Sequence, residues 1–361
     1  MKRIFLLLAV IGFLSLPSAN GQSQSGRVYE FVNLPTTARI TALGGYGAPQ
    51  TGNDLGMALF YPALMEHMDG NQLSLNFVDY FGDINYGTAA ASGEFSKLGK
   101  VNAAVQFINY GTFTHADELG NRHGEFTGAE YAVSLGWGRQ LSERFSIGSN
   151  IRFINSAFEQ YSSFGLAADV GFAYVNPENE WVSSLVFRNM GRQITNYEGE
   201  NEPLPFDIVL GVSKKLINAP LRFSVVAHNL HNPDLTYTSP TDNEQTFLGN
   251  QSIPGETDRM AEIGDQIMRH LVFGMEFLPT RNFIVAIGYN YRRRQEMKVD
   301  TRLSTVGLSW GVGIRISHFM LQYGRAHYHL AGSPNHFSIS TDLDKLFFRP
   351  TEEKPSIRQN M

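Results

Sequence analysis

Large apolar residues alternate with small or polar ones along most of the chain, and the stretch 143–175 shows this most clearly. The odd-numbered positions named here are large and apolar: Phe145, Ile147, Ile151 and Phe153. The even-numbered positions between and beside them are small or polar: Ser146, Gly148, Asn150 and Arg152. After a turn near 158–163 the same pattern returns between Phe164 and Tyr174. Such alternation is typical of a strand, because successive side chains point to opposite faces. Each run has the roughly 9–11 residues that a tilted strand needs to cross a bilayer.

The alternating segments come in series, which predicts an all-β protein. We count about fourteen of them, near 71–80, 84–94, 100–111, 127–139, 143–157, 161–175, 181–189, 206–215, 220–229, 268–278, 282–292, 305–316, 318–328 and 335–343. The segment at 84–94 alternates weakly. The pattern does not say which face is buried, since a soluble sandwich hides its apolar face and a membrane barrel turns that face to lipid.

The lengths of the connections favour the membrane barrel. Connections after even-numbered segments are short, and most of those after odd-numbered segments are long: 112–126, 190–205, 231–266 and 293–304. The connections after the first and fifth segments are short exceptions. Long loops at one end and short turns at the other are typical of outer-membrane barrels. We therefore expect a transmembrane outer-membrane β-barrel of about 14 antiparallel strands over residues 71–343, with both ends in the periplasm.

The two ends of the chain have a different character. Residues 1–21 resemble a secretory signal peptide, with Lys2 and Arg3 before an apolar core and small residues near a cleavage site before Gln22. Residues 22–70 do not alternate, and Pro and Gly residues predict tight turns there, so we expect an N-terminal periplasmic or plug segment. Residues 344–361 form a predicted periplasmic tail, which ends in Met361 where many barrels end in an aromatic residue.

Composition agrees with a membrane barrel and excludes several functions. Charged residues make up 17% of the 361 residues, against about 25% in ordinary soluble domains, and 35 residues are glycine. The net charge is −5 with no basic cluster, which argues against a nucleic-acid partner. The chain has no cysteine, so disulfides, thiolate catalysis, cysteine-bound metals and a lipoprotein anchor are excluded.

Motifs of catalysis and cofactor binding are missing from the sequence. It has no Gly-x-Ser-x-Gly elbow, phosphate-binding loop or His-Glu-x-x-His motif, so we expect neither an enzyme nor a cofactor. His327 and His329 share one strand face but lack a carboxylate at ligand spacing, so no metal site is expected. Arg152 and Asp169 lie on the polar faces of adjacent segments, which predicts a structural ion pair in the lumen.

The connection 231–266 is the candidate for binding a partner. It is long and polar, and it contains scattered residues suited to an interface: Asp234, Tyr237, Asp242, Phe247 and Ile253. Long loops on a rigid scaffold often carry function. The alternative is a solvated loop that merely tolerates variation.

Several motifs resemble one family of outer-membrane proteins. The run 31–45 is similar to the start of the PorV/PorQ family of the type IX secretion system. The run 54–64 resembles that family's stretch ending in Asn-Pro-Ala-Leu, with Tyr61 here in place of the asparagine. Arg188-Asn-Met-Gly191 and His228-Asn-Leu-His231 resemble its repeats at strand ends. Length and the short polar tail favour the PorQ branch of the family.

This resemblance implies a FadL-like barrel that acts without catalysis. It implies a place in the cell-surface attachment complex of a Bacteroidetes-type outer membrane, where external loops would hold PorZ together with PorU and PorV. Outer-membrane lipid is a further implied contact, and whether lipopolysaccharide takes part stays open. The alternative is a FadL-type channel for hydrophobic small molecules. An apolar lumen near 31–65 would favour the channel, and a polar, plugged lumen would favour the anchor.

Overall fold

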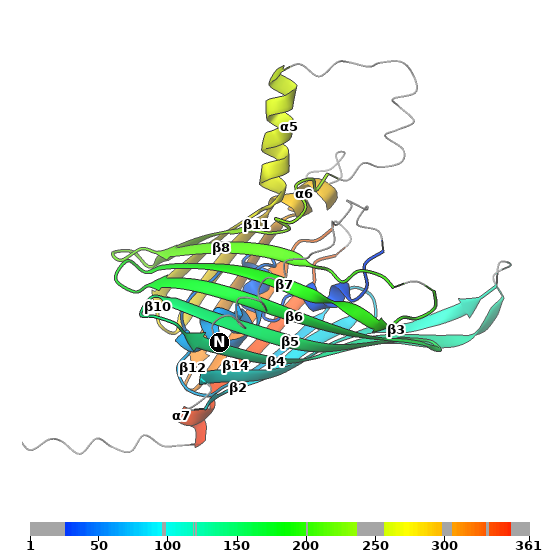
Figure 1. Cartoon of the computed structure of the whole chain (residues 1–361), viewed down its shortest axis with the longest axis horizontal. Coiled ribbons are helices and arrows are strands. Elements are labelled where there is room, and N and C mark those ends of the chain that lie inside the picture. The colour runs from blue at the N-terminus through cyan, green and yellow to red at the C-terminus, as the bar shows by residue number, and fades with distance from the viewer. Residues whose placement is uncertain are drawn as a thin grey trace, which may run out of the picture.

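Fourteen antiparallel strands close into one barrel, in which each strand pairs with its neighbours in sequence and β1 pairs with β14 (Figure 1). The computed structural model describes residues 26–95, 99–117, 119, 121–199, 201–236, 256–297, 305–329 and 332–347. The predicted signal peptide and most of the predicted tail lie outside these residues. The expected strand number and the barrel fold are confirmed.

The strands have the following bounds: β1 Gln72–Asp79, β2 Asn85–Phe95, β3 Gly99–Ala116, β4 Arg122–Gln140, β5 Phe145–Phe158, β6 Tyr161–Asn176, β7 Trp181–Thr195, β8 Asp207–Lys215, β9 Leu221–Ala227, β10 Leu271–Thr280, β11 Phe283–Asn290, β12 Leu308–Ile316, β13 Phe319–Ala326 and β14 Asn335–Asp342. The helices are η1 Glu30–Asn33, α2 Ala38–Ala42, α3 Leu55–Phe60, η2 Pro62–His67, α5 Glu256–Arg269, α6 Tyr291–Met297 and α7 Leu343–Phe347.

The large apolar parity faces outward, as expected for a membrane barrel. On β5, Phe145 is 54% exposed and Ile151 is 47% exposed, whereas Asn150 and Arg152 between and beside them are buried at 1% and 5%. A soluble sandwich would show the reverse arrangement. None of the helices in the described part of the chain is both long enough and apolar enough to cross a membrane.

Three of the expected long connections hold regular structure. The predicted loop 112–126 is wrong, because β3 and β4 continue through it to form a hairpin in which the rings of Phe113 and Phe126 stack at 5.1 Å. The predicted loop 231–266 contains most of α5, and 293–304 contains most of α6. Both helices project from one end of the barrel, here called the α5 end, and α7 lies at the other end (Figure 1).

Residues 26–70 lie inside the barrel. Helix α2 packs against β11 to β14, α3 against β1 and β2, and η2 against β3 to β6. Side chains from this segment and from the inner wall form the buried apolar clusters of the protein. The core of the molecule therefore lies in the lumen, between the N-terminal segment and the wall.

Inward-facing glycines let the segment approach the wall closely. A Cβ added at Gly148 would lie 2.3 Å from the carbonyl carbon of Pro62, and one added at Gly288 would lie 2.4 Å from that of Leu43. At Gly324 it would lie 2.2 Å from the carbonyl oxygen of Ala38. Real Cβ atoms do not come this close to backbone atoms, so these wall positions require glycine.

Candidate functional site

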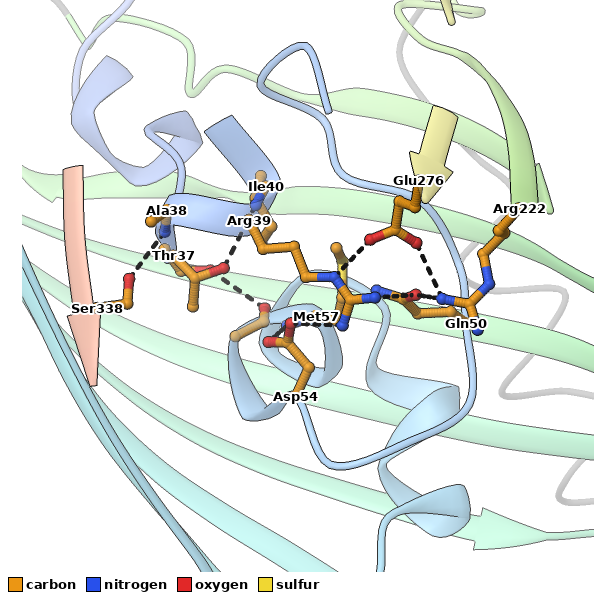
Figure 2. Close-up of polar contacts among 12 residues, drawn as sticks. Thr37, Ala38, Arg39, Ile40, Gln50, Asp54, Met57, Arg222, Glu276 and Ser338 are labelled. Carbon is orange, nitrogen blue, oxygen red and sulfur yellow. Dashed lines mark hydrogen bonds and ion pairs between the residues drawn. The ribbon is translucent and has the colours of Figure 1, made fainter. Parts of the chain in front are cut away.

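A buried cluster of charges joins the lumen segment to the wall (Figure 2). Arg39 of α2 donates from Nε to Glu276 on β10, with 2.7 Å between Nε and Oε1. It donates from Nη2 to Gln50 at 2.9 Å and from Nη1 to Asp54 at 3.4 Å. Glu276 also accepts from Arg222 at 2.9 Å. We call these five residues the Arg39 cluster.

Local structure places each member of the cluster. Thr37 caps α2 by accepting from the backbone of Ile40, which sets the direction of the short helix that carries Arg39. Asp54 caps α3 in the same way, so one carboxylate both starts a helix and contacts Arg39. Glu276 and Arg222 face each other across β10 and β9.

The charges of the Arg39 cluster balance in a nearly dry setting. Glu276 is 1% exposed, and the two arginine side chains are 12% and 13% exposed. A buried ion pair rarely stabilises a fold more than well-packed apolar residues would, but removing one partner costs several kcal/mol. The cluster therefore fixes the position of the segment. Its ion pairs are noncovalent, so the segment could also separate from the wall without any bond being cleaved.

A small void lies beside Arg39. Its volume is about 10 Å³, and it is lined by Arg39, Ala42, Ile284, Ala286 and Gly311 among others. This is close to the space that a single water occupies. The segment and this part of the wall are thus packed with little empty space.

The inner wall under the segment carries a set of apolar side chains from β6 to β11, interspersed with buried polar ones. These apolar side chains pack against side chains such as Leu43, Met57 and Phe60 of the segment. They are valines and alanines: Ala173, Val175, Val182, Val186, Val209, Val226, Val272 and Ala286. We call these eight residues the valine track. A water-filled barrel would carry polar residues in these positions.

The predicted lumen residues Arg152 and Asp169 lie together and buried. Nη2 of Arg152 is 2.6 Å from Oδ2 of Asp169. Asp169 also accepts from the side chain of Asn150 at 3.1 Å and from the backbone N–H of Asn189 at 2.8 Å. Charge and hydrogen-bonding capacity are satisfied within the protein, as a structural role requires.

Two sequence motifs share one local backbone arrangement, the first within β7 and the second directly after β9. Asn189 and Asn229 both have left-handed backbones, with φ of 54° and 53°. The backbone N–H of Asn229 donates to Asp207 at 2.6 Å, as that of Asn189 does to Asp169. Asparagine tolerates this conformation better than most residues.

The residue before each of these asparagines contacts an aromatic ring of the segment. The Arg188 guanidinium lies 3.8 Å from the centre of the Phe60 ring. The His228 ring stacks on Tyr46 with 4.1 Å between centres and 12° between planes. Both motifs are visible in the sequence as a repeated pattern, but these two contacts were not predicted from it.

The other predicted site residues are not brought together. Asp234 is exposed, and the side-chain and backbone hydrogen bonds from Thr236 lower the pKa of its carboxyl. Tyr237, Asp242, Phe247 and Ile253 lie outside the described residues. His327 contacts the hydroxyls of Thr305 and Ser333 at 3.1 and 3.2 Å. No group of three or more potential metal ligands is found in the described ranges.

No protein-family model matches the sequence, and neither does any curated protein. Among solved structures, the chain is similar to the Pseudomonas putida toluene transporter TodX, with a TM-score of 0.52 and 10% identity over 85% of this chain and 96% of that one. A TodX deltaS2 mutant, described as a monoaromatic hydrocarbon channel, has a TM-score of 0.52 and 11% sequence identity, over 86% of this chain and 98% of that one. A Pseudomonas aeruginosa FadL homologue has a TM-score of 0.46 and 12% sequence identity, over 85% of this chain and 98% of that one. The likeness to TodX shows the fold, a FadL-like barrel of the outer-membrane type.

The Arg39 cluster generates a stability prediction. Replacing Glu276→Gln leaves the shape but removes the negative charge between two buried arginines, so we expect a loss of about 3 kcal/mol in the free energy of unfolding. Urea unfolding of the barrel in detergent measures this. The control is Glu178→Gln, because Glu178 is 78% exposed and its 3.5 Å contact with Arg144 should contribute little. Equal unfolding free energies for the two variants would contradict a structural role of the cluster.

Proposed function

We propose that this barrel carries hydrophobic small molecules across the outer membrane, with the N-terminal segment as its gate. The observation that supports this best is the valine track. A segment that moved away would uncover these eight apolar side chains along β6 to β11. Such a surface favours apolar solutes, at roughly 25 cal/mol for each Å² removed from water.

The way the segment is held is consistent with a gate. Glycines on the wall seat its backbone, and the Arg39 cluster supplies a charged connection to β9 and β10. Buried ion pairs of this kind serve well as switch elements, because their two arrangements can lie close in free energy. In this mechanism the protein performs no bond chemistry, and the solute moves by partitioning along the track.

The known structures support the choice of solute. TodX is described as a toluene transporter and as a monoaromatic hydrocarbon channel. At 10–11% identity the likeness concerns the fold, and function depends on the site that a fold carries. The valine track supplies an argument from the site itself, which is why we place hydrophobic solutes ahead of polar ones.

Uptake of radiolabelled toluene by cells with and without the barrel tests the proposal. We expect the barrel to raise uptake, and we expect the triple variant Val186→Thr, Val209→Thr and Val226→Thr to lower it about tenfold by placing hydroxyls in the track. The matched control changes Val105, Val133 and Val225 to threonine on the outer face, where each is exposed. Uptake equal to that of cells lacking the barrel would contradict the proposal.

A second candidate function is a surface anchor, and helix α5 favours it. Met260, Ile263 and Ile267 on this helix are 75%, 55% and 57% exposed. Residues at such spacing share one helix face, which suits docking to another protein. On the family resemblance, that protein would be PorZ, with PorU and PorV in the same complex.

Deleting residues 240–255 tests the anchor. In sequence these residues come between β9 and α5 and belong to neither, so the barrel should still fold while surface retention of the partner is lost. Fractionation of cells followed by immunoblotting of PorZ measures retention. Retention that is unchanged by the deletion would contradict docking through this connection.

A further inference from the structure

Two residues of the wall hold aromatic rings of the N-terminal segment at the α5 end of the valine track. On β7, Arg188 comes two positions after Val186 of the track. His228 comes two positions after Val226 of the track, directly beyond β9. Both side chains contact the segment and are almost fully buried, with 2% and 1% of their surface exposed. The track therefore ends on this side in two polar side chains.

The two wall residues and two rings of the segment form one continuous stack. The Arg188 guanidinium lies over the face of the Phe60 ring. The Phe60 ring meets the Tyr46 ring edge to face, with 6.1 Å between the ring centres and 83° between the planes. The Tyr46 ring in turn lies flat on the His228 ring. The wall thus supplies the two ends of a stack whose middle belongs to the segment.

Hydrogen bonds do not explain why these two polar side chains are buried here. Within the described residues, the two ring nitrogens of His228 and the Nε of Arg188 have no hydrogen-bond partner, which is unfavourable for buried polar atoms. Asp207 is the register partner of Arg188 and places one carboxylate on the next strand. Both side chains do present a flat surface to a ring, and guanidinium–ring and ring–ring contacts are attractive. Contact with rings is therefore the main interaction that this arrangement provides.

The segment fills the space between Arg188 and His228 with groups that resemble aromatic solutes. The side chain of Phe60 is a benzyl group, which has the carbon skeleton of toluene, and the side chain of Tyr46 carries a hydroxyl in addition. If the segment leaves the wall, as a gate must, the two wall residues lose these rings. A solute ring can then take their place. A saturated solute of the same size fills the same volume but has no π face for the guanidinium.

We infer that Arg188 and His228 are the residues that select aromatic solutes over saturated ones. The inference rests on the proposed transport function and adds to it the chemical class of the solute. The mechanism is an exchange, in which the rings of Phe60 and Tyr46 leave the two wall residues and a solute ring replaces them. In the expected orientation of the barrel, this end of the valine track is the first part that a solute from outside the cell reaches.

A purely structural role for the same contacts makes a different prediction. In that role the two wall residues hold the segment closed and never contact a solute. Loss of such a contact changes the uptake of every solute by the same factor, because it changes only how often the gate opens. Loss of a recognition surface changes the ratio between aromatic and saturated solutes. The ratio of two uptakes is therefore the quantity to measure.

Uptake of radiolabelled toluene and methylcyclohexane by cells with and without the barrel gives this ratio, because the two solutes share a carbon skeleton and differ in the π system. We expect the wild type to favour toluene. We expect His228→Leu to lower barrel-dependent toluene uptake about fivefold, with methylcyclohexane little changed, and His228→Phe to restore the preference. The matched control is His318→Leu, since His318 is exposed in the turn between β12 and β13.

A double variant tests the other wall residue. Arg188→Met combined with Asp207→Asn removes the guanidinium without leaving a buried charge alone, and it should also lower the preference for toluene. Far-UV circular dichroism of each purified barrel checks the fold. The inference is overturned if the wild type takes up both solutes equally, or if His228→Leu changes both uptakes by the same factor or changes neither. A barrel that raises the uptake of neither solute would contradict the proposed function itself, and the inference with it.

Discussion

Every backbone polar group in the hydrocarbon layer must find a partner within the protein, and the pairing of β1 with β14 meets this requirement. Eight residue pairs, from Gln72 with Asp342 to Asp79 with Asn335, close the sheet and leave no free edge. Closure also fixes the register around the whole barrel. That register decides which side chains face lipid and which face the lumen, so the site inside follows from it.

A closed barrel of this size must either hold water or be filled, and here the N-terminal segment fills it. Three physical devices accommodate the segment: glycines where backbones meet, valines where side chains meet, and compensated charges at the Arg39 cluster. All three are noncovalent, so each can form again after the segment has moved. This combination is why we assign the segment the role of a gate, in preference to a permanent filling.

Strand positions could be predicted from the sequence because alternation is a local property. Even the weakly alternating stretch at 84–94 forms β2, since pairing with β1 and β3 on both sides imposes the strand that its Ala and Gly residues only weakly favour. The ion pair of Arg152 and Asp169 could be placed because one hairpin joins their segments. The hairpin at 112–126 was missed because its polar and aromatic residues continue the strands without an apolar face.

Contacts between the segment and the wall could not be predicted from the sequence. Arg39 and Glu276 are separated by 237 positions, and their contact depends on where a short helix sits in a closed lumen. The stacking of His228 on Tyr46 and of Arg188 on Phe60 has the same origin. The number of glycines did not predict these contacts. A glycine that lets another backbone approach closely cannot be distinguished in the sequence from one that permits a turn.

Locking the segment to the wall is the most direct measurement of the gate. The Oγ1 atom of Thr41 lies 2.8 Å from Nδ1 of His336 on β14, so Thr41→Cys and His336→Cys can be joined by a short bis-methanethiosulfonate linker. The chain has no other cysteine, so only this pair can react. Our account predicts that toluene uptake falls to background when the linker is in place and returns when dithiothreitol removes it. Equal uptake in the linked and released states would contradict a moving segment.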